Sequence, residues 1–124
     1  MRENRGPYTG TMTAMSNGGN FARIVLSTAA NPEEAERIAR TLVEERLAAC
    51  ATLVPSVRSI YRWEGKIEDA QETLLLIKTG AEQLTALEAR LLALHSYETP
   101  EFLVIEPTAG SVAYLEWMQS NLGA

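Results

Sequence analysis

Residues 57–79 read VRSIYRWEGKIEDAQETLLLIKT, and the fold can be built from this stretch. Two extended runs, Val57 to Trp63 and Ala70 to Thr79, are rich in β-branched, aromatic and other apolar residues, as strands are. Glu64-Gly65-Lys66 lies between them and is typical of a tight turn. The stretch therefore predicts a long antiparallel hairpin in the middle of the chain.

A strand and a helix precede the hairpin. The run Arg23 to Thr28 predicts a buried strand, and Asn31-Pro32 favours a helix start because Asn can cap it and Pro fits its first turn. Apolar residues then recur every three or four positions as far as Leu47, which predicts an amphipathic helix. A further extended run, Ala49 to Val54, meets the hairpin at Pro55, which cannot donate to a ladder and marks a bulge or a sheet edge.

A helix, a strand and a second short helix follow the hairpin. A stripe of leucines from about Ala81 to His95-Ser96 predicts a helix, and Phe102 to Ile105 predicts the last strand. Val112 to Met118 predicts a terminal helix. The order is β-α-β-β-α-β with an extra C-terminal helix, so we expect an α+β sandwich of the ferredoxin-like class, with two helices on one face of an antiparallel sheet.

The N-terminal segment has a different composition. Residues 1–20 are rich in Gly, Asn, Thr and Ser and lack an apolar segment, so we expect a disordered leader. Met12 and Met15 are alternative starts, and a vector remnant or an over-long gene prediction would give the same pattern. Residues 21–124 are expected to form one domain, because 124 residues are too few for two domains of ordinary size.

Composition and charge restrict the classes of partner. A net charge of -5, with scattered Lys and Arg, disfavours a nucleic-acid groove and makes cations the more natural partners. No apolar run is long enough to cross a bilayer, so no membrane partner is expected. Cys50 is the only cysteine, which excludes an intrachain disulfide and fits a reducing compartment such as the cytoplasm.

The strands are apolar on both faces, although two helices can cover only one. In the second hairpin strand Leu74 and Leu76 point one way while Leu75 and Ile77 point the other. An uncovered apolar face usually marks an interface, so we expect it to be buried by another subunit. The alternative is that the C-terminal helix or the leader folds over this face.

Four segments together resemble the CutA family of divalent-cation tolerance proteins. They are Leu47-Ala48-Ala49-Cys50-Ala51, Ile60-Tyr61-Arg62-Trp63-Glu64-Gly65-Lys66, His95-Ser96-Tyr97-Glu98-Thr99-Pro100-Glu101 and Tyr114-Leu115-Glu116-Trp117. The resemblance runs from about Arg23 to the end of the chain. It implies a ferredoxin-like homotrimer whose long hairpins pair between subunits, and a role in the response to divalent metal ions, with copper as the usual metal.

The resemblance carries over a metal site only in part. The family's proposed copper ligands are a Cys in the first strand and a His pair before the Tyr of the last motif, and the matching positions here are Ser27, Leu94 and His95. Only His95 keeps a metal-binding side chain. The usual Pro after this His is Ser96. No cofactor is assigned beyond copper(II) or another divalent cation.

Candidate metal ligands therefore lie in the segment before the last strand. His95 is either a ligand or the C-cap of the second helix, where its charged form suits the negative end of the dipole. Glu98 and Glu101 either supply oxygen ligands or belong to a solvated loop. Cys50 is either a thiolate ligand or a small buried residue.

Aromatic residues near the hairpin tip predict a cleft or an interface. Tyr61 and Trp63 lie two apart on a strand and hence on one face. With Lys66, Tyr97 and Glu101 they either line a ligand cleft between subunits or anchor the trimer. Both interpretations stay open at this point.

The leading hypothesis is a trimeric, non-enzymatic protein of CutA type that binds or responds to metal ions. Its alternative is a sensor of small molecules or anions, like the PII signalling proteins, which rests on fold analogy. An enzyme that uses His95 as a base is disfavoured because the chain has one His and no recognised catalytic motif. An RNA-binding domain is disfavoured because the central strands carry Leu74 and Leu76 where stacking aromatics would be needed.

Overall fold

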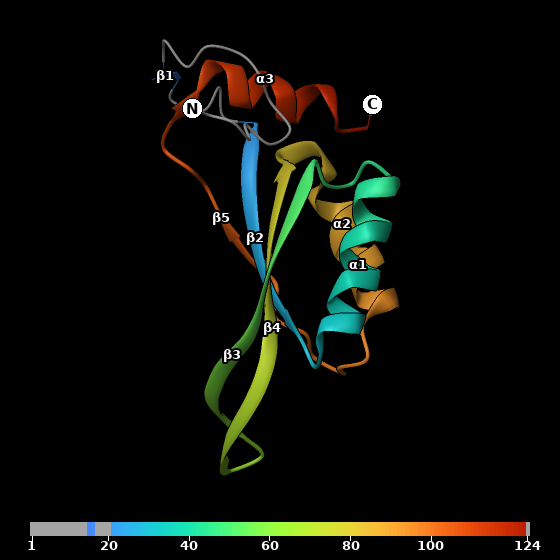
Figure 1. Ribbon diagram of the computed structural model, residues 1–124, viewed down its shortest axis with the longest axis vertical. Helices are drawn as coiled ribbons and strands as arrows, with labels where there is room; N and C mark the ends of the chain where they lie inside the picture. The colour runs from blue at the N-terminus through green and yellow to red at the C-terminus, as the bar shows by residue number, and fades with distance from the viewer. Residues whose placement is uncertain (1–14, 17–20, 124) are drawn as a thin grey trace, which may run out of the picture.

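The computed structural model describes residues 15–16 and 21–123. A four-stranded antiparallel sheet has the strand order β3-β4-β2-β5, and helices α1 and α2 pack side by side on one of its faces (Figure 1). The elements are β2 (Ala22–Ala29), α1 (Pro32–Glu44), β3 (Cys50–Trp63), β4 (Lys66–Gly80), α2 (Leu84–Leu94) and β5 (Leu103–Ile105). The expected ferredoxin-like topology is confirmed.

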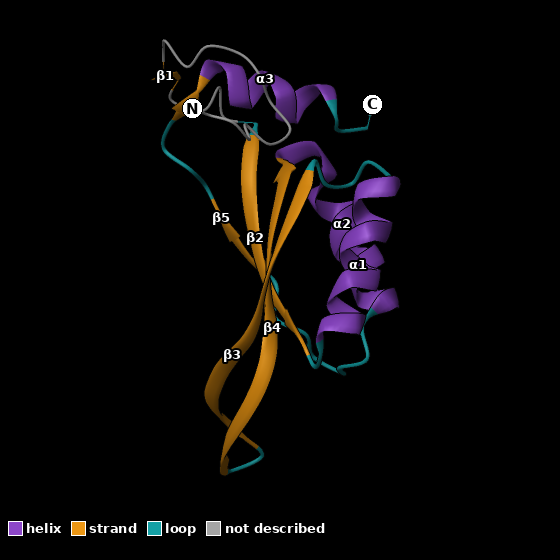
Figure 2. Ribbon diagram, viewed as in Figure 1, coloured by secondary structure: helices purple, strands orange, loops and turns teal. Residues whose placement is uncertain are grey.

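The predicted hairpin dominates the outline of the molecule. Strands β3 and β4 contain 14 and 15 residues, and their outer half extends beyond the helices (Figure 2). Glu64 and Gly65 turn the chain with φ values of 50° and 81°, the left-handed region that two-residue hairpin turns require. The register shifts between Val54 and Val57, so β3 is a single strand with a bulge beside Pro55.

The main core lies between the sheet and the two helices. Asn31 caps α1 by accepting the Glu34 N–H at 2.8 Å, as its position predicts. The helix then buries its apolar stripe against the inward residues of the strands. Fully buried members of this core are Val25, Ile38, Leu42, Leu75, Ile77, Leu87 and Leu91.

The opposite face of the sheet, which we call the bare face, is also apolar. Leu74 and Leu76 are half-buried there, whereas Leu75 and Ile77 on the helix-covered face are fully buried. On β5, Leu103 pairs with Leu26 and remains exposed. The predicted two-faced pattern is confirmed. Cys50 is half-buried outside the core, with its Sγ 4.0 Å from the Lys78 Nζ.

The terminal helix α3 (Val112–Ser120) lies across one end of the sheet (Figure 1). It forms a second cluster in which Leu115 and Met118 pack with Ala22 and Ala49. This cluster does not include Leu74 or Leu76 among the described residues, so α3 does not cover the centre of the bare face.

Two short strands near the ends of the chain were not predicted. Strands β1 (Met15–Ser16) and β6 (Gly110–Ser111) pair as a small antiparallel sheet, and a 3-10 turn, η1 (Ala81–Gln83), precedes α2. Apart from Met15–Ser16, the leader expected over residues 1–20 lies outside the described residues. In the described part of the chain, no helix combines the length and the apolar character that crossing a bilayer requires.

Candidate functional site

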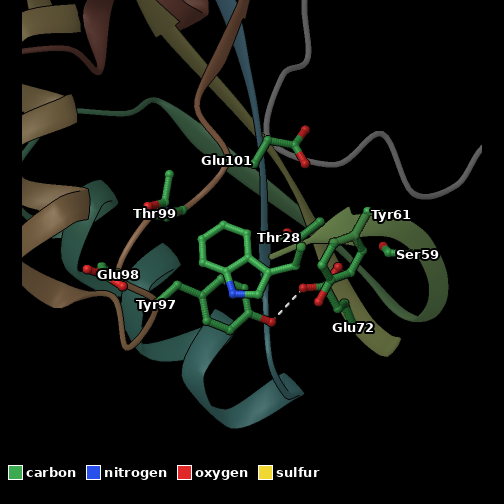
Figure 3. Close-up of a pocket in the computed structure, with 10 residues that line it drawn as sticks. Thr28, Ser59, Tyr61, Glu72, Tyr97, Glu98, Thr99 and Glu101 are labelled. Carbon is green, nitrogen blue, oxygen red and sulfur yellow. Dashed lines mark hydrogen bonds between the residues drawn. The ribbon is translucent and has the colours of Figure 1, made fainter. Parts of the chain in front are cut away.

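A pocket of about 530 Å³ opens beside the hairpin, at the end of β2 and next to the loop that joins α2 to β5 (Figure 3). Strands β2, β3 and β4 and the loop all contribute to its wall. The lining residues are Thr28, Ser59, Tyr61, Trp63, Glu72, Tyr97, Glu98, Thr99, Pro100 and Glu101. Residues far apart in the sequence therefore meet in one cavity of the size that small molecules occupy.

The pocket combines aromatic and acidic side chains. Three of its lining residues are aromatic and three are glutamates, and none of the described residues that line it is Lys or Arg. Tyr61 and Trp63 share one face of β3, as their spacing predicts, and this face looks into the pocket. Its lining is thus apolar in part and negative in charge at neutral pH.

Tyr97 is fixed at the pocket by a short hydrogen bond. Its hydroxyl donates to the Glu72 Oε2 at 2.5 Å (Figure 3). Burial, followed by the acceptor and negative charge of Glu72, raises the pKa of Tyr97 well above its ordinary value. The phenol therefore stays a neutral donor across the physiological range.

We expect Tyr97 to resist ionisation in alkali. Because its pKa is raised by folding, its contribution to stability is complete below the ordinary tyrosine pKa of 10 and is lost as pH rises through the folded value. Absorbance titration of the phenolate should show one tyrosine that ionises late, and Tyr97→Phe should remove that step. Ionisation of every tyrosine near the ordinary pKa, with the circular dichroism unchanged, would contradict the expectation.

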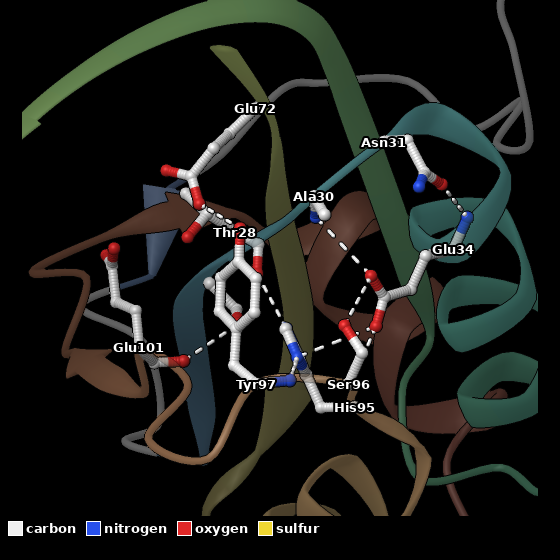
Figure 4. Close-up of polar contacts among 10 residues, drawn as sticks. Thr28, Ala30, Asn31, Glu34, Glu72, His95, Ser96, Tyr97 and Glu101 are labelled. Atoms are coloured by element: carbon white, nitrogen blue, oxygen red, sulfur yellow. Dashed lines mark hydrogen bonds and ion pairs between the residues drawn. The ribbon is translucent and has the colours of Figure 1, made fainter. Parts of the chain in front are cut away.

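The ring of His95 is enclosed beside the pocket, with only 1% of its side chain exposed. Its Nε2 lies 2.7 Å from the Thr28 carbonyl oxygen, and the Tyr97 N–H points to its Nδ1 at 3.0 Å (Figure 4). A carbonyl can only accept and an amide N–H can only donate, so these two contacts fit the tautomer with the hydrogen on Nε2. His95 thus joins β2 to the loop that carries Tyr97.

Glu34 completes this polar cluster from the first turn of α1. Its carboxylate accepts the Ser96 N–H at 2.7 Å and the Ser96 hydroxyl at 3.0 Å, and one oxygen lies 3.6 Å from the His95 Nδ1 (Figure 4). Burial by itself would raise the pKa of Glu34, but the hydrogen bonds from Ser96 outweigh it and hold the pKa below its usual value. The carboxylate is therefore charged and anchors the start of the loop.

These contacts bear on the predicted metal ligands. Both nitrogens of His95 are engaged, and the ring does not line the pocket, whereas Glu98 does. The Ser27 hydroxyl donates to the Glu101 carbonyl at 2.7 Å and holds the loop against β2. Within the described ranges, no three His, Cys, Asp or Glu side chains are grouped so that they could hold a metal ion. A metal site at His95 and Glu98 stays a prediction that this geometry does not favour.

The structure places the remaining predicted residues in different surroundings. Tyr61, Trp63, Tyr97 and Glu101 meet in the pocket, but Lys66 sits beside the hairpin turn, opposite Trp63 in the ladder, and is not part of the lining. His95 is the C-cap of α2 through its backbone N–H, as one alternative held. The hydrogen bonds of its ring go to Thr28 and Tyr97.

Sequence reasoning missed two acidic residues of this region. Glu72 has a visible signal, since it stands two positions before Leu74 on the same strand face, where an acid interrupts an apolar row. Glu34 has no such signal in the sequence, because an acid in the first turn of a helix is already explained by its favourable interaction with the helix dipole. Only the tertiary contact with Ser96 reveals its second role.

Comparison with known proteins agrees with this fold. The family model described as CutA1 divalent ion tolerance protein matches residues 23–121. The divalent-cation tolerance protein CutA of Thermus thermophilus is 45% identical over 100 residues, which cover 81% of this chain and 97% of that protein. The solved structure of CutA from Synechococcus elongatus PCC7942 has a TM-score of 0.84 and 39% identity, and covers 90% of this chain and 97% of that one.

A second structure of the Synechococcus protein, complexed with a Bis-Tris molecule, has a TM-score of 0.81 and 38% identity, and covers 88% of this chain and all of that one. The family model spans most of the described residues, and the sequence and structure relatives agree with it. The chain belongs to the CutA1 family of divalent ion tolerance proteins.

Proposed function

We propose that the chain acts as a trimeric, non-enzymatic binding protein of the CutA family, with the pocket at Tyr61, Trp63 and Tyr97 as its ligand site. The observation that carries the proposal is the pocket itself, a cavity of about 530 Å³ with aromatic and acidic walls. The Synechococcus relative complexed with Bis-Tris supports a small organic ligand for this fold. An enzymatic role for His95 has no support in its geometry, because both ring nitrogens already have partners.

We propose that the role of this chain in divalent-cation tolerance does not depend on a copper site at His95. Ser27 and Leu94 stand where the resemblance expects ligands, and the Ser27 hydroxyl is bonded to the Glu101 carbonyl. A neutral imidazole with both nitrogens engaged must give up one hydrogen bond before it can bind a metal. We therefore expect copper(II) to bind weakly at this position.

The assembly is proposed from apolar surface that this chain leaves uncovered. Ile60 and Ile67, near the end of the hairpin, are 64% and 61% exposed, and Leu103, Val104 and Ile105 on the edge strand β5 are exposed as well. Apolar side chains at sheet edges in a stable protein are usually covered by another chain. The proposed number of subunits, three, comes from the family resemblance.

Two other functions lose support. An anion sensor of the PII kind would need basic residues at its ligand, but the described lining has three glutamates and no Lys or Arg. An RNA platform would need aromatics on the central strands, where Leu26, Leu74 and Leu76 lie instead. The cytoplasm stays the proposed compartment, supported by the single reduced cysteine.

The proposal is tested by the mass in solution together with copper(II) and zinc(II) titrations of the same sample. We expect three times the chain mass of 13.6 kDa, and a weak copper response that His95→Gln does not change. A monomer would overturn the proposed assembly. Tight copper binding that His95→Gln abolishes would instead restore the predicted metal site.

A further inference from the structure

We propose that the pocket recognises a small organic cation, an alkylammonium group held between the aromatic rings with the Glu72 carboxylate as its counter-ion. This inference rests on the proposed ligand site and names its chemical class. It is carried by the surroundings of Glu72, by the aromatic wall and by the way the three acids are distributed.

Glu72 is a buried carboxylate without a cationic partner. Only 6% of the residue is exposed, yet it is part of the pocket lining. Its hydrogen bond comes from the neutral Tyr97 hydroxyl, and none of the ion pairs among the described residues includes it. A buried carboxylate is costly unless a positive charge compensates it. The pocket therefore favours a ligand that brings this charge.

The aromatic wall determines which kind of cation fits. Tyr61 and Trp63 remain exposed on the face of β3 that looks into the pocket, and Tyr97 lies across from them on the loop. Rings attract a cation through their negative faces, and they also offer apolar area to the alkyl groups of an ammonium ion. A hydrated metal ion would gain nothing from this apolar area.

The acids themselves argue against a metal ion. Glu72, Glu98 and Glu101 all line the pocket, but they are not grouped closely enough to form a ligand set in the described part of the chain. Divalent cations need several oxygens within a short radius, whereas an organic cation needs a negative surround of larger size. A spread of carboxylates around aromatic rings therefore matches an ammonium group better than a metal.

Tetramethylammonium is the probe for the test, and tert-butanol is its neutral analogue of similar shape. The full chain is used with Trp117→Phe, so that Trp63 is the remaining tryptophan and its fluorescence reports on the pocket. Potassium chloride at the same ionic strength controls for salt. We expect a saturable change with tetramethylammonium and binding of tert-butanol that is weaker by about tenfold or more.

Variants connect the binding to particular residues. Glu72→Gln removes the counter-ion and should weaken tetramethylammonium binding by about tenfold. Glu88→Gln makes the same change of charge on the exposed face of α2 and should leave the affinity unchanged. Tyr97→Phe keeps the ring but removes the hydroxyl, so it should have a smaller effect than Glu72→Gln.

Equal binding of tetramethylammonium and tert-butanol, no binding of either, or full affinity in Glu72→Gln would each overturn the inference. Isothermal calorimetry of the unaltered chain, with Trp63→Leu as a second variant, keeps the test valid if Glu72→Gln folds poorly. If the binding test contradicts the ligand class but the mass is that of three chains, the proposed trimer is retained. A monomeric chain that still prefers tetramethylammonium would refute the assembly and retain the ligand class.

Discussion

Replacing both Ile60 and Ile67 with aspartate is expected to convert the assembly into monomers of 13.6 kDa. The two side chains share one face of the hairpin, because Ile60 pairs with Asp69 and Ile67 pairs with Arg62. They are 64% and 61% exposed in the single chain, and burial of this remaining area by a neighbour would stabilise the contact by roughly 2 to 4 kcal/mol per chain. Aspartate removes this contribution of apolar burial to the contact and adds a charge that is costly to bury.

Ile60 and Ile67 lie on the face of the hairpin opposite the pocket, so this double substitution leaves the pocket lining unchanged. Tyr61 and Trp63 line the pocket from one face of β3, whereas Ile60 lies on the other. Sedimentation equilibrium measures the mass, and circular dichroism checks that the monomer is folded. Leu92→Asp, at an exposed apolar position on α2, is the matched control and should keep the mass of the parent. An unchanged mass in the double variant would place the interface elsewhere.

Local sequence patterns predicted the elements of the fold because those elements depend on neighbours in the chain. The cap at Asn31, the stripe of α1 and the turn at Glu64-Gly65 each follow from residues within a few positions. Strand β4 begins at Lys66, earlier than the predicted Ala70, because its polar first residues extend by pairing with β3. The pairing of Met15–Ser16 with Gly110–Ser111 joins the two ends of the chain and leaves no local pattern.

The site was predictable where it depends on alternation along a strand. Tyr61 and Trp63 line the pocket because residues two apart share a face, and the segment with Tyr97, Glu98 and Glu101 joins them. The orientation of His95 could not be derived, because it depends on the Thr28 carbonyl on β2, which is distant in sequence. Lys66 has the same strand parity as Glu72 and pairs with Trp63, yet it is not part of the lining, and strand parity alone does not explain this.

Removing the Glu34 carboxylate is expected to destabilise the fold by about 3 kcal/mol, because hydrogen bonds to a charged group contribute roughly 1.5 to 3 kcal/mol each. Glu34→Ala leaves the Ser96 N–H and hydroxyl without their acceptor and frees the loop that carries Tyr97. Glu33→Ala is the matched control, since Glu33 is in the same turn of α1 but exposed. It should cost about 0.3 to 1 kcal/mol through the helix dipole alone.

The pH dependence of the unfolding free energy shows whether the negative charge of Glu34 or only the packing of its side chain stabilises the fold. Because folding lowers the pKa of this carboxyl, its contribution to stability is complete above the ordinary value of 4.5 and is lost as pH falls through the folded value. Urea unfolding of the parent and of Glu34→Gln, at one chain concentration, should therefore give a stability difference at neutral pH that shrinks in acid. A constant difference from neutral to acidic pH would show that the carboxylate charge is not what holds Ser96, and that packing alone stabilises the start of this loop.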